Sequence, residues 1–167
     1  MFPSLRAGYL IVPPPLVDAF GAAVRLTGQQ VPAAHQAALA DFITEGHFAA
    51  HVRRMRALYA TRRAHLVASL RRRLSGILEV VPSEGGMQLA ATLPAGVDDV
   101  AASRAADAGG IVAPPLAMYH LGTHLGTRRR RGLHLGYASV REREMGSQVE
   151  RLARSLESVT GRRRRAK

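Results

Sequence analysis

The sequence contains no cysteine and only one lysine, and both shortages restrict its chemistry. Without cysteine there are no disulfides, no thiolate zinc sites and no cysteine nucleophile, a composition that fits a cytosolic protein. Lys167 is the only lysine among 24 basic side chains, so no internal lysine amine is available for catalysis. A phosphate-binding loop that ends in Gly-Lys is excluded for the same reason.

Long apolar runs and aromatic side chains are also scarce. No stretch reaches the ~18 to 20 uninterrupted apolar residues of a membrane-spanning helix. Residues 1–15 lack the longer apolar core and the cleavage site of a signal peptide. We therefore expect a cytoplasmic protein with no membrane partner. Aromatic residues make up 5% of the chain and tryptophan is absent, which disfavours the stacking of nucleic-acid bases.

Positive charge is the most prominent property that the sequence does have. Basic residues outnumber acidic ones by 24 to 12, which gives a net charge of +12. A field of this size attracts phosphate backbones, so one hypothesis is a free-standing Arg-rich module for nucleic-acid binding or dimerisation. Arginine in place of lysine, beside abundant alanine and glycine, is equally typical of a compositionally biased genome. The arginines cluster at residues 53–54, 71–73, 128–131 and 162–165.

The hydrophobic pattern predicts a mixed fold. Hydrophobic residues make up 47% of the chain, enough for a core. Apolar spacing and glycine stops predict helices over residues 16–26, 32–45, 47–74, 95–108 and 140–159. Short apolar or alternating runs predict strands over residues 8–12, 77–81, 87–93, 111–113 and 133–139. This order indicates an α/β arrangement in which helices cover a small sheet.

The first predicted strand is unusual because no partner strand lies near it in the sequence. Residues 8–12 form a continuous apolar run, typical of a buried strand, that three prolines end. An unpaired strand leaves backbone groups and apolar surface exposed. We therefore expect that the chain begins in the middle of a domain, and that this segment aggregates or is partly disordered.

Segments spread along the chain resemble one known family. They read FPSLRAGYLIVP, HVRRMRALYATRR, GGMQLAATLP and LHLGYA, at residues 2–13, 51–63, 85–94 and 133–138. In this order they are similar to the C-terminal part of the aminotransferase-like domain of fold-type I pyridoxal-phosphate enzymes. The resemblance is strongest to the MocR-type transcriptional regulators of the GntR superfamily.

The resemblance implies a domain organisation. Residues 1–46 would end the large cofactor domain, residues 47–160 would form a long linking helix and a small α/β domain, and residues 161–167 a disordered basic tail. The family's Schiff-base lysine falls two residues before Met1, so we expect the chain to be inactive alone, whether its parent is an aminotransferase or a regulator. The intact parent would bind pyridoxal phosphate, form a homodimer, sense an amino acid or amine, and bind DNA through an N-terminal winged helix.

The resemblance also implies two binding residues and no catalytic residue. Arg6 matches the arginine that follows the lysine and binds the cofactor phosphate, which a guanidinium fork suits. His134 stands where aminotransferases of this fold carry the arginine that binds the substrate carboxylate. The plainer interpretation of His134 is a half-buried, hydrogen-bonded histidine on a strand. One of the arginines at 128–131 is an alternative carboxylate ligand.

Two histidine pairs have the spacing of metal ligands on a helix or loop. His47 and His51 are four residues apart in a predicted helix, and His120 and His124 lie in a Gly-rich loop. Neither pair has a third ligand or the glutamate of an HExxH motif. We therefore predict surface histidines and no metal site.

Overall fold

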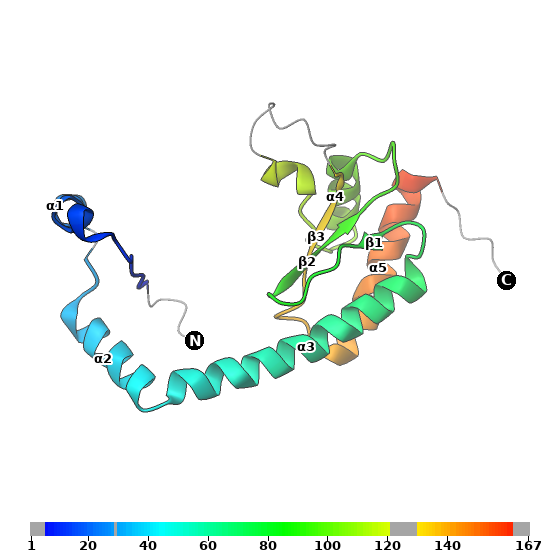
Figure 1. Cartoon of the computed structure of the whole chain (residues 1–167). Coiled ribbons are helices and arrows are strands. Elements are labelled where there is room, and N and C mark those ends of the chain that lie inside the picture. The colour runs from blue at the N-terminus through cyan, green and yellow to red at the C-terminus, as the bar shows by residue number, and fades with distance from the viewer. Residues whose placement is uncertain (1–5, 29, 121–129, 162–167) are drawn as a thin grey trace. The chain divides into compact units, whose positions relative to one another are not determined.

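The computed structural model describes residues 6–28, 30–120 and 130–161 (Figure 1). The chain divides into two compact units, Met1–Met55 and Arg56–Lys167. The division at residue 46 that the resemblance implies stays a prediction. Residues 162–167, most of the predicted basic tail, lie outside the described residues.

The first unit consists of short helices and an irregular segment. A 3-10 helix, η1 (Pro14–Leu16), leads into α1 (Val17–Thr27) and is followed by α2 (Ala33–Thr44) and the first part of α3 (His47–Arg73). Helix α1 ends at Gly28, whose φ of 63° is the left-handed conformation that favours glycine. Helix α2 begins directly after Pro32, one residue later than the helix predicted over residues 32–45.

The buried strand predicted at residues 8–12 is wrong. The described residues before η1 form no strand, and Tyr9 and Ile11 are 87% and 90% exposed. A strand needs a neighbour for its backbone groups, and the described part of this unit offers none. None of the unit's described residues is buried, so these residues form no core among themselves.

The second unit holds a three-stranded antiparallel sheet in the order β1-β2-β3. Helix α4 (Asp99–Ala108) and helix α5 (Glu142–Thr160) pack against each other beside this sheet (Figure 1). The predicted α/β class, with a small sheet covered by helices, is confirmed. The strands are β1 (Glu79–Val80), β2 (Gln88–Thr92) and β3 (Gly132–Gly136).

The strand predicted at residues 111–113 is also wrong. This segment is not part of a strand, and an isolated bridge pairs Pro115 with Leu133. Pro114 and Pro115 have no N–H to donate, so the ladder cannot continue through them. A short 3-10 helix, η2 (Leu116–Tyr119), follows instead.

The core of the second unit lies between the sheet and its helices. Leu89 and Ala91 of β2 and Leu133 and Leu135 of β3 are buried, and they alternate along their strands with more exposed residues. Because successive side chains of a strand point to opposite faces, His134 lies on the sheet face away from this core. The helices contribute Leu66, Leu70, Ala102, Ala106, Met145, Val149, Leu152 and Leu156, and the buried Leu74 directly follows α3. Within the described residues, no helix is both long and apolar enough to cross a bilayer.

Candidate functional site

The buried carboxylate of Asp99 organises the polar side of the sheet. The residue is 1% exposed, and its Oδ2 atom accepts hydrogen bonds from the backbone N–H of Ala117 at 3.0 Å and of Gly132 at 3.3 Å. Its neighbour Asp98 is the N-cap of α4 and accepts from the N–H of Val100. One oxygen of Asp99 therefore fixes η2 against the start of β3.

Gly132 lets β3 approach both β2 and η2 closely, because glycine has no side chain and none would fit at this position. A Cβ atom there would lie 2.8 Å from Cδ1 of Leu116 and would overlap the carbonyl oxygen of Ala91. These neighbours belong to η2 and β2, respectively. The absence of a side chain at Gly132 is thus what lets β3 lie between them.

His134 and Tyr119 form a polar pair on the face that the core leaves open. Oη of Tyr119 lies 3.1 Å from Nδ1 of His134. Their ring centroids are 5.1 Å apart at an interplanar angle of 72°, an edge-to-face contact. The backbone N–H of His134 donates to the carbonyl of Pro114 at 2.8 Å. The sequence-predicted His134 is therefore half-buried and hydrogen-bonded, and Tyr119 is a partner that sequence reasoning missed.

The alternative carboxylate ligands at residues 128–131 are only partly described. Nη1 of Arg131 lies 3.3 Å from Oδ1 of Asp98, and both side chains are more than half exposed. Water screens such a pair, so it contributes little to stability. Arg130 is exposed and lines an open hollow with Pro94, while residues 128 and 129 lie outside the described part of the chain.

Arg6 belongs to the first unit, and its surroundings do not form a complete cofactor site. It is exposed and lines an open apolar groove of about 1190 Å³ that α1 and α2 border. Pyridoxal phosphate needs a lysine amine for its aldehyde as well as cations and amides for its phosphate. The described residues offer two exposed guanidinium groups here, those of Arg6 and Arg25, and no lysine. They do not fit this cofactor by themselves.

The histidine pairs show no metal centre in the described residues. No three potential ligands gather in that part of the chain. Nε2 of His47 lies 3.2 Å from Oε2 of the exposed Glu45. His124 lies outside the described residues.

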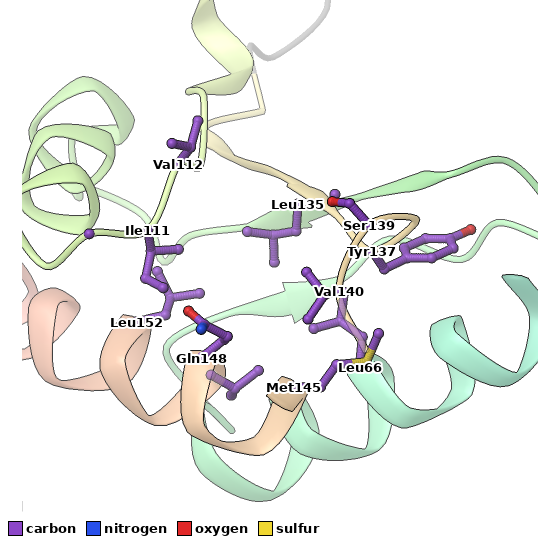
Figure 2. Close-up of a pocket in the computed structure, with 13 residues that line it drawn as sticks. Leu66, Ile111, Val112, Leu135, Tyr137, Ser139, Val140, Met145, Gln148 and Leu152 are labelled. Carbon is purple, nitrogen blue, oxygen red and sulfur yellow. The ribbon is translucent and has the colours of Figure 1, made fainter. Parts of the chain in front are cut away.

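The second unit also contains a recess with a mainly apolar lining (Figure 2). It is a cavity of about 300 Å³ at the end of β3, bordered by α3, α5 and residues 110–112. Figure 2 shows apolar side chains around it, such as Ile111, Leu135 and Leu152, with the amide of Gln148 among them. Among the described residues, no carboxylate, histidine or arginine side chain lines it. This recess therefore offers no charged side chain to a ligand.

Comparison with known proteins identifies the family. Residues 2–152 match the family described as aminotransferase class I and II. The chain belongs to this family. Solved aminotransferases share the fold: α-aminoadipate aminotransferase LysN from Thermus thermophilus has a TM-score of 0.77 at 20% identity, over 90% of this chain and 38% of that one. The multiple substrate aminotransferase from Thermococcus profundus has a TM-score of 0.78 at 23% identity, over 90% of this chain and 36% of that one.

The curated relatives of this aminotransferase-family chain are named as transcriptional regulators. It is 40% identical to the probable rhizopine catabolism regulatory protein MocR of Rhizobium meliloti, over 91% of this chain and 30% of that protein. It is 30% identical to the HTH-type regulator YhdI of Bacillus subtilis, over 91% of this chain and 32% of that protein. The chain thus spans about a third of the length of these relatives.

Proposed function

We propose that this chain is the C-terminal part of the effector-sensing, aminotransferase-like domain of a MocR-type transcriptional regulator. The observation that carries the proposal is the 40% identity to a MocR protein over 91% of the chain. In the intact protein, pyridoxal phosphate and an amino compound would shift the domain's conformation, and an attached winged helix would read out that shift on DNA. The intact regulator would act as a homodimer in the cytoplasm.

His134 is the proposed contact for the effector's carboxylate. An arginine offers a carboxylate two parallel N–H donors, whereas a neutral imidazole offers one. A single donor binds the carboxylate less tightly and leaves it more free to turn. Reversible sensing tolerates such a contact better than transamination does, because turnover requires a fixed orientation.

Arg6 is the proposed ligand of the cofactor phosphate in the intact protein. Its guanidinium can form two charge-assisted hydrogen bonds with phosphate oxygens. Pyridoxal phosphate supplies the electrophilic aldehyde with which an amino group condenses. The lysine that holds it would come from residues of the parent that precede Met1.

The test begins with the DNA upstream of the Met1 codon, translated in all three forward frames. We expect one frame to supply a serine and a lysine just before Met1 and a long domain before them. The longer protein should absorb as a Schiff base with pyridoxal phosphate, and its DNA affinity should change with cofactor and amine. An Arg6→Ala variant should bind the cofactor more weakly. Stop codons in every frame would refute the proposal. A longer protein whose absorbance and DNA affinity do not change with pyridoxal phosphate would refute it equally.

A second candidate function is supported by the net charge of +12. Arg71 and Arg72 at the end of α3 are exposed, and within the described chain they have no ion-pair partner. The chain alone would then bind nucleic acid through its phosphates. Binding that falls steeply with added salt and ignores pyridoxal phosphate would favour this function.

A further inference from the structure

We infer that Tyr119 is a positioning residue that fixes the tautomer of His134, so that the ring's Nε2 carries the proton and donates to a ligand carboxylate. The identity of the ligand rests on the proposed function. The tautomer rests on the geometry of the described residues alone.

The direction of the hydrogen bond follows from the chemistry of its two partners. The phenol O–H of Tyr119 and the N–H of a neutral imidazole are both donors, but the phenol is the more acidic and therefore the better donor. Oη lies 3.1 Å from Nδ1, a hydrogen-bonding distance. From the acidity of the two groups we assign the tyrosine as the donor and Nδ1 as the acceptor. A neutral ring carries one proton, so the proton of His134 then lies on Nε2.

Nε2 is available for a ligand. No residue in the described chain forms a hydrogen bond with this atom, and the ring is only half-buried. A protonated Nε2 attracts a carboxylate oxygen. The opposite tautomer would present a lone pair there and repel it.

The pair is held by the backbone and does not depend on a ligand. Asp99 accepts from the N–H of Ala117, two residues before Tyr119, and from that of Gly132, two residues before His134. The N–H of His134 itself donates to Pro114. Both rings therefore start from segments that one buried carboxylate fixes. This preorganisation lowers the entropic cost of holding the imidazole in one orientation when a ligand binds.

The tautomer is measurable in the full chain labelled with ¹⁵N-histidine. Long-range ¹H–¹⁵N correlation spectra in alkaline buffer, where imidazole rings are neutral, distinguish a protonated Nε2 from a protonated Nδ1. We expect His134 to show a protonated Nε2 in the wild type and a mixture of tautomers in Y119F. Y137F is the matched control, because the hydroxyl of Tyr137 donates to the carbonyl of Gly86 and not to His134.

Sodium acetate serves as the carboxylate probe in the same chain. We expect it to shift the Nε2 resonance of His134, with at least a several-fold weaker dissociation constant in Y119F than in Y137F. The amide of a glutamine places its nitrogen near the position of Nε2, whereas that of an asparagine lies nearer Nδ1. Acetate binding, followed by the amide of Gly132, should therefore persist in H134Q and be lost in H134N.

A protonated Nδ1 in the wild-type spectrum would overturn the inference, and this result needs no variant to fold. An unchanged tautomer in Y119F would overturn it equally. A tautomer that shifts in Y119F while acetate has no effect in any variant supports the positioning role. That last result counts against the carboxylate ligand, and so against the proposed function.

Discussion

Arg62 on α3 and Glu142 at the start of α5 form an ion pair in which Nε of the arginine donates to Oε1 of the glutamate at 3.1 Å. The two side chains are 17% and 34% exposed, so water screens this pair less than the surface pairs of the chain. The same guanidinium donates from Nη1 to the carbonyl oxygen of Ala138. Arg62 therefore connects α3, the segment after β3 and the first turn of α5.

This ion pair predicts a pH dependence of stability. The backbone N–H of Glu142 and the guanidinium of Arg62 hold the pKa of that carboxyl below its ordinary value of 4.5. A carboxyl whose pKa is lower in the folded than in the unfolded state stabilises the fold above the unfolded value. That contribution is lost as the pH falls through the folded value. We expect E142Q to lower the melting temperature at pH 7, and to match the wild type at a pH low enough to protonate the Glu142 carboxyl of the wild type.

Glu144 provides the control for this comparison. It lies in the same first turn of α5, and its pair with Arg143 is longer, at 3.7 Å, and more exposed. E144Q should therefore change the melting temperature less than E142Q at pH 7. Equal losses in the two variants would show that the general charge of the helix terminus matters, and not the contact with Arg62.

Removal of the Asp99 carboxylate should be costly. D99A leaves the N–H groups of Ala117 and Gly132 without their acceptor, and the loss at the buried Gly132 costs about 1 to 3 kcal/mol. Chemical denaturation should report a loss of a few kcal/mol. D98N is the comparison, because asparagine caps a helix as well as aspartate and Asp98 is exposed. A mild D99A variant would contradict the role given to this carboxylate.

Two glycines of β3 should respond differently to a methyl group. G132A forces a Cβ onto the carbonyl oxygen of Ala91, and overpacking of this kind costs about 1 to 3 kcal/mol. In G136A the nearest atom is Cγ of Gln88 at 4.0 Å, an ordinary contact. Denaturation midpoints should therefore fall for G132A and stay near the wild type for G136A. If both variants fall equally, the close approach of β2 to Gly132 does not explain the glycine there.

Amide hydrogen exchange should separate the two units. Tyr9, Leu10 and Ile11 form no strand and are largely exposed, so their amides should exchange rapidly. The amides of Leu89 and Ala91 in β2 should exchange most slowly, because both residues are buried inside the sheet. Strong protection of residues 9–11 in the same cooperative transition would contradict this expectation.

The sequence predicted the helices well because their signals are local. Gly28 takes the left-handed conformation directly after α1, where the sequence predicted a glycine stop. The strands were less predictable, because pairing depends on neighbours that periodicity does not reveal. The apolar run at residues 8–12 has the composition of a strand, but the described residues of its unit form no strand that could pair with it. Residues 111–113 are followed by two prolines, which have no N–H groups to extend the isolated bridge between Pro115 and Leu133 into a ladder.

The candidate site shows the same limit. His134 was found through the family resemblance, but its partner Tyr119 lies 15 residues away in a segment without periodic pattern. Asp98 and Asp99 are adjacent carboxylates that both suit a helix start, so the sequence does not reveal which one is buried. The structure makes Asp98 the exposed cap and Asp99 the buried acceptor. That distinction depends on η2 and β3, which approach α4 only in the folded chain.

The junction between the units lies inside α3, after Met55, where the backbone is helical on both sides. Proteases prefer exposed, extended backbone, which a continuous helix does not present. Limited digestion should therefore cut before His47, near Gly46, whose φ of 81° interrupts the helical path. The product would retain the whole of α3, including Arg53 and Arg54. A digestion product that begins at His47 and contains the sheet would therefore still include residues 47–55 of the first unit.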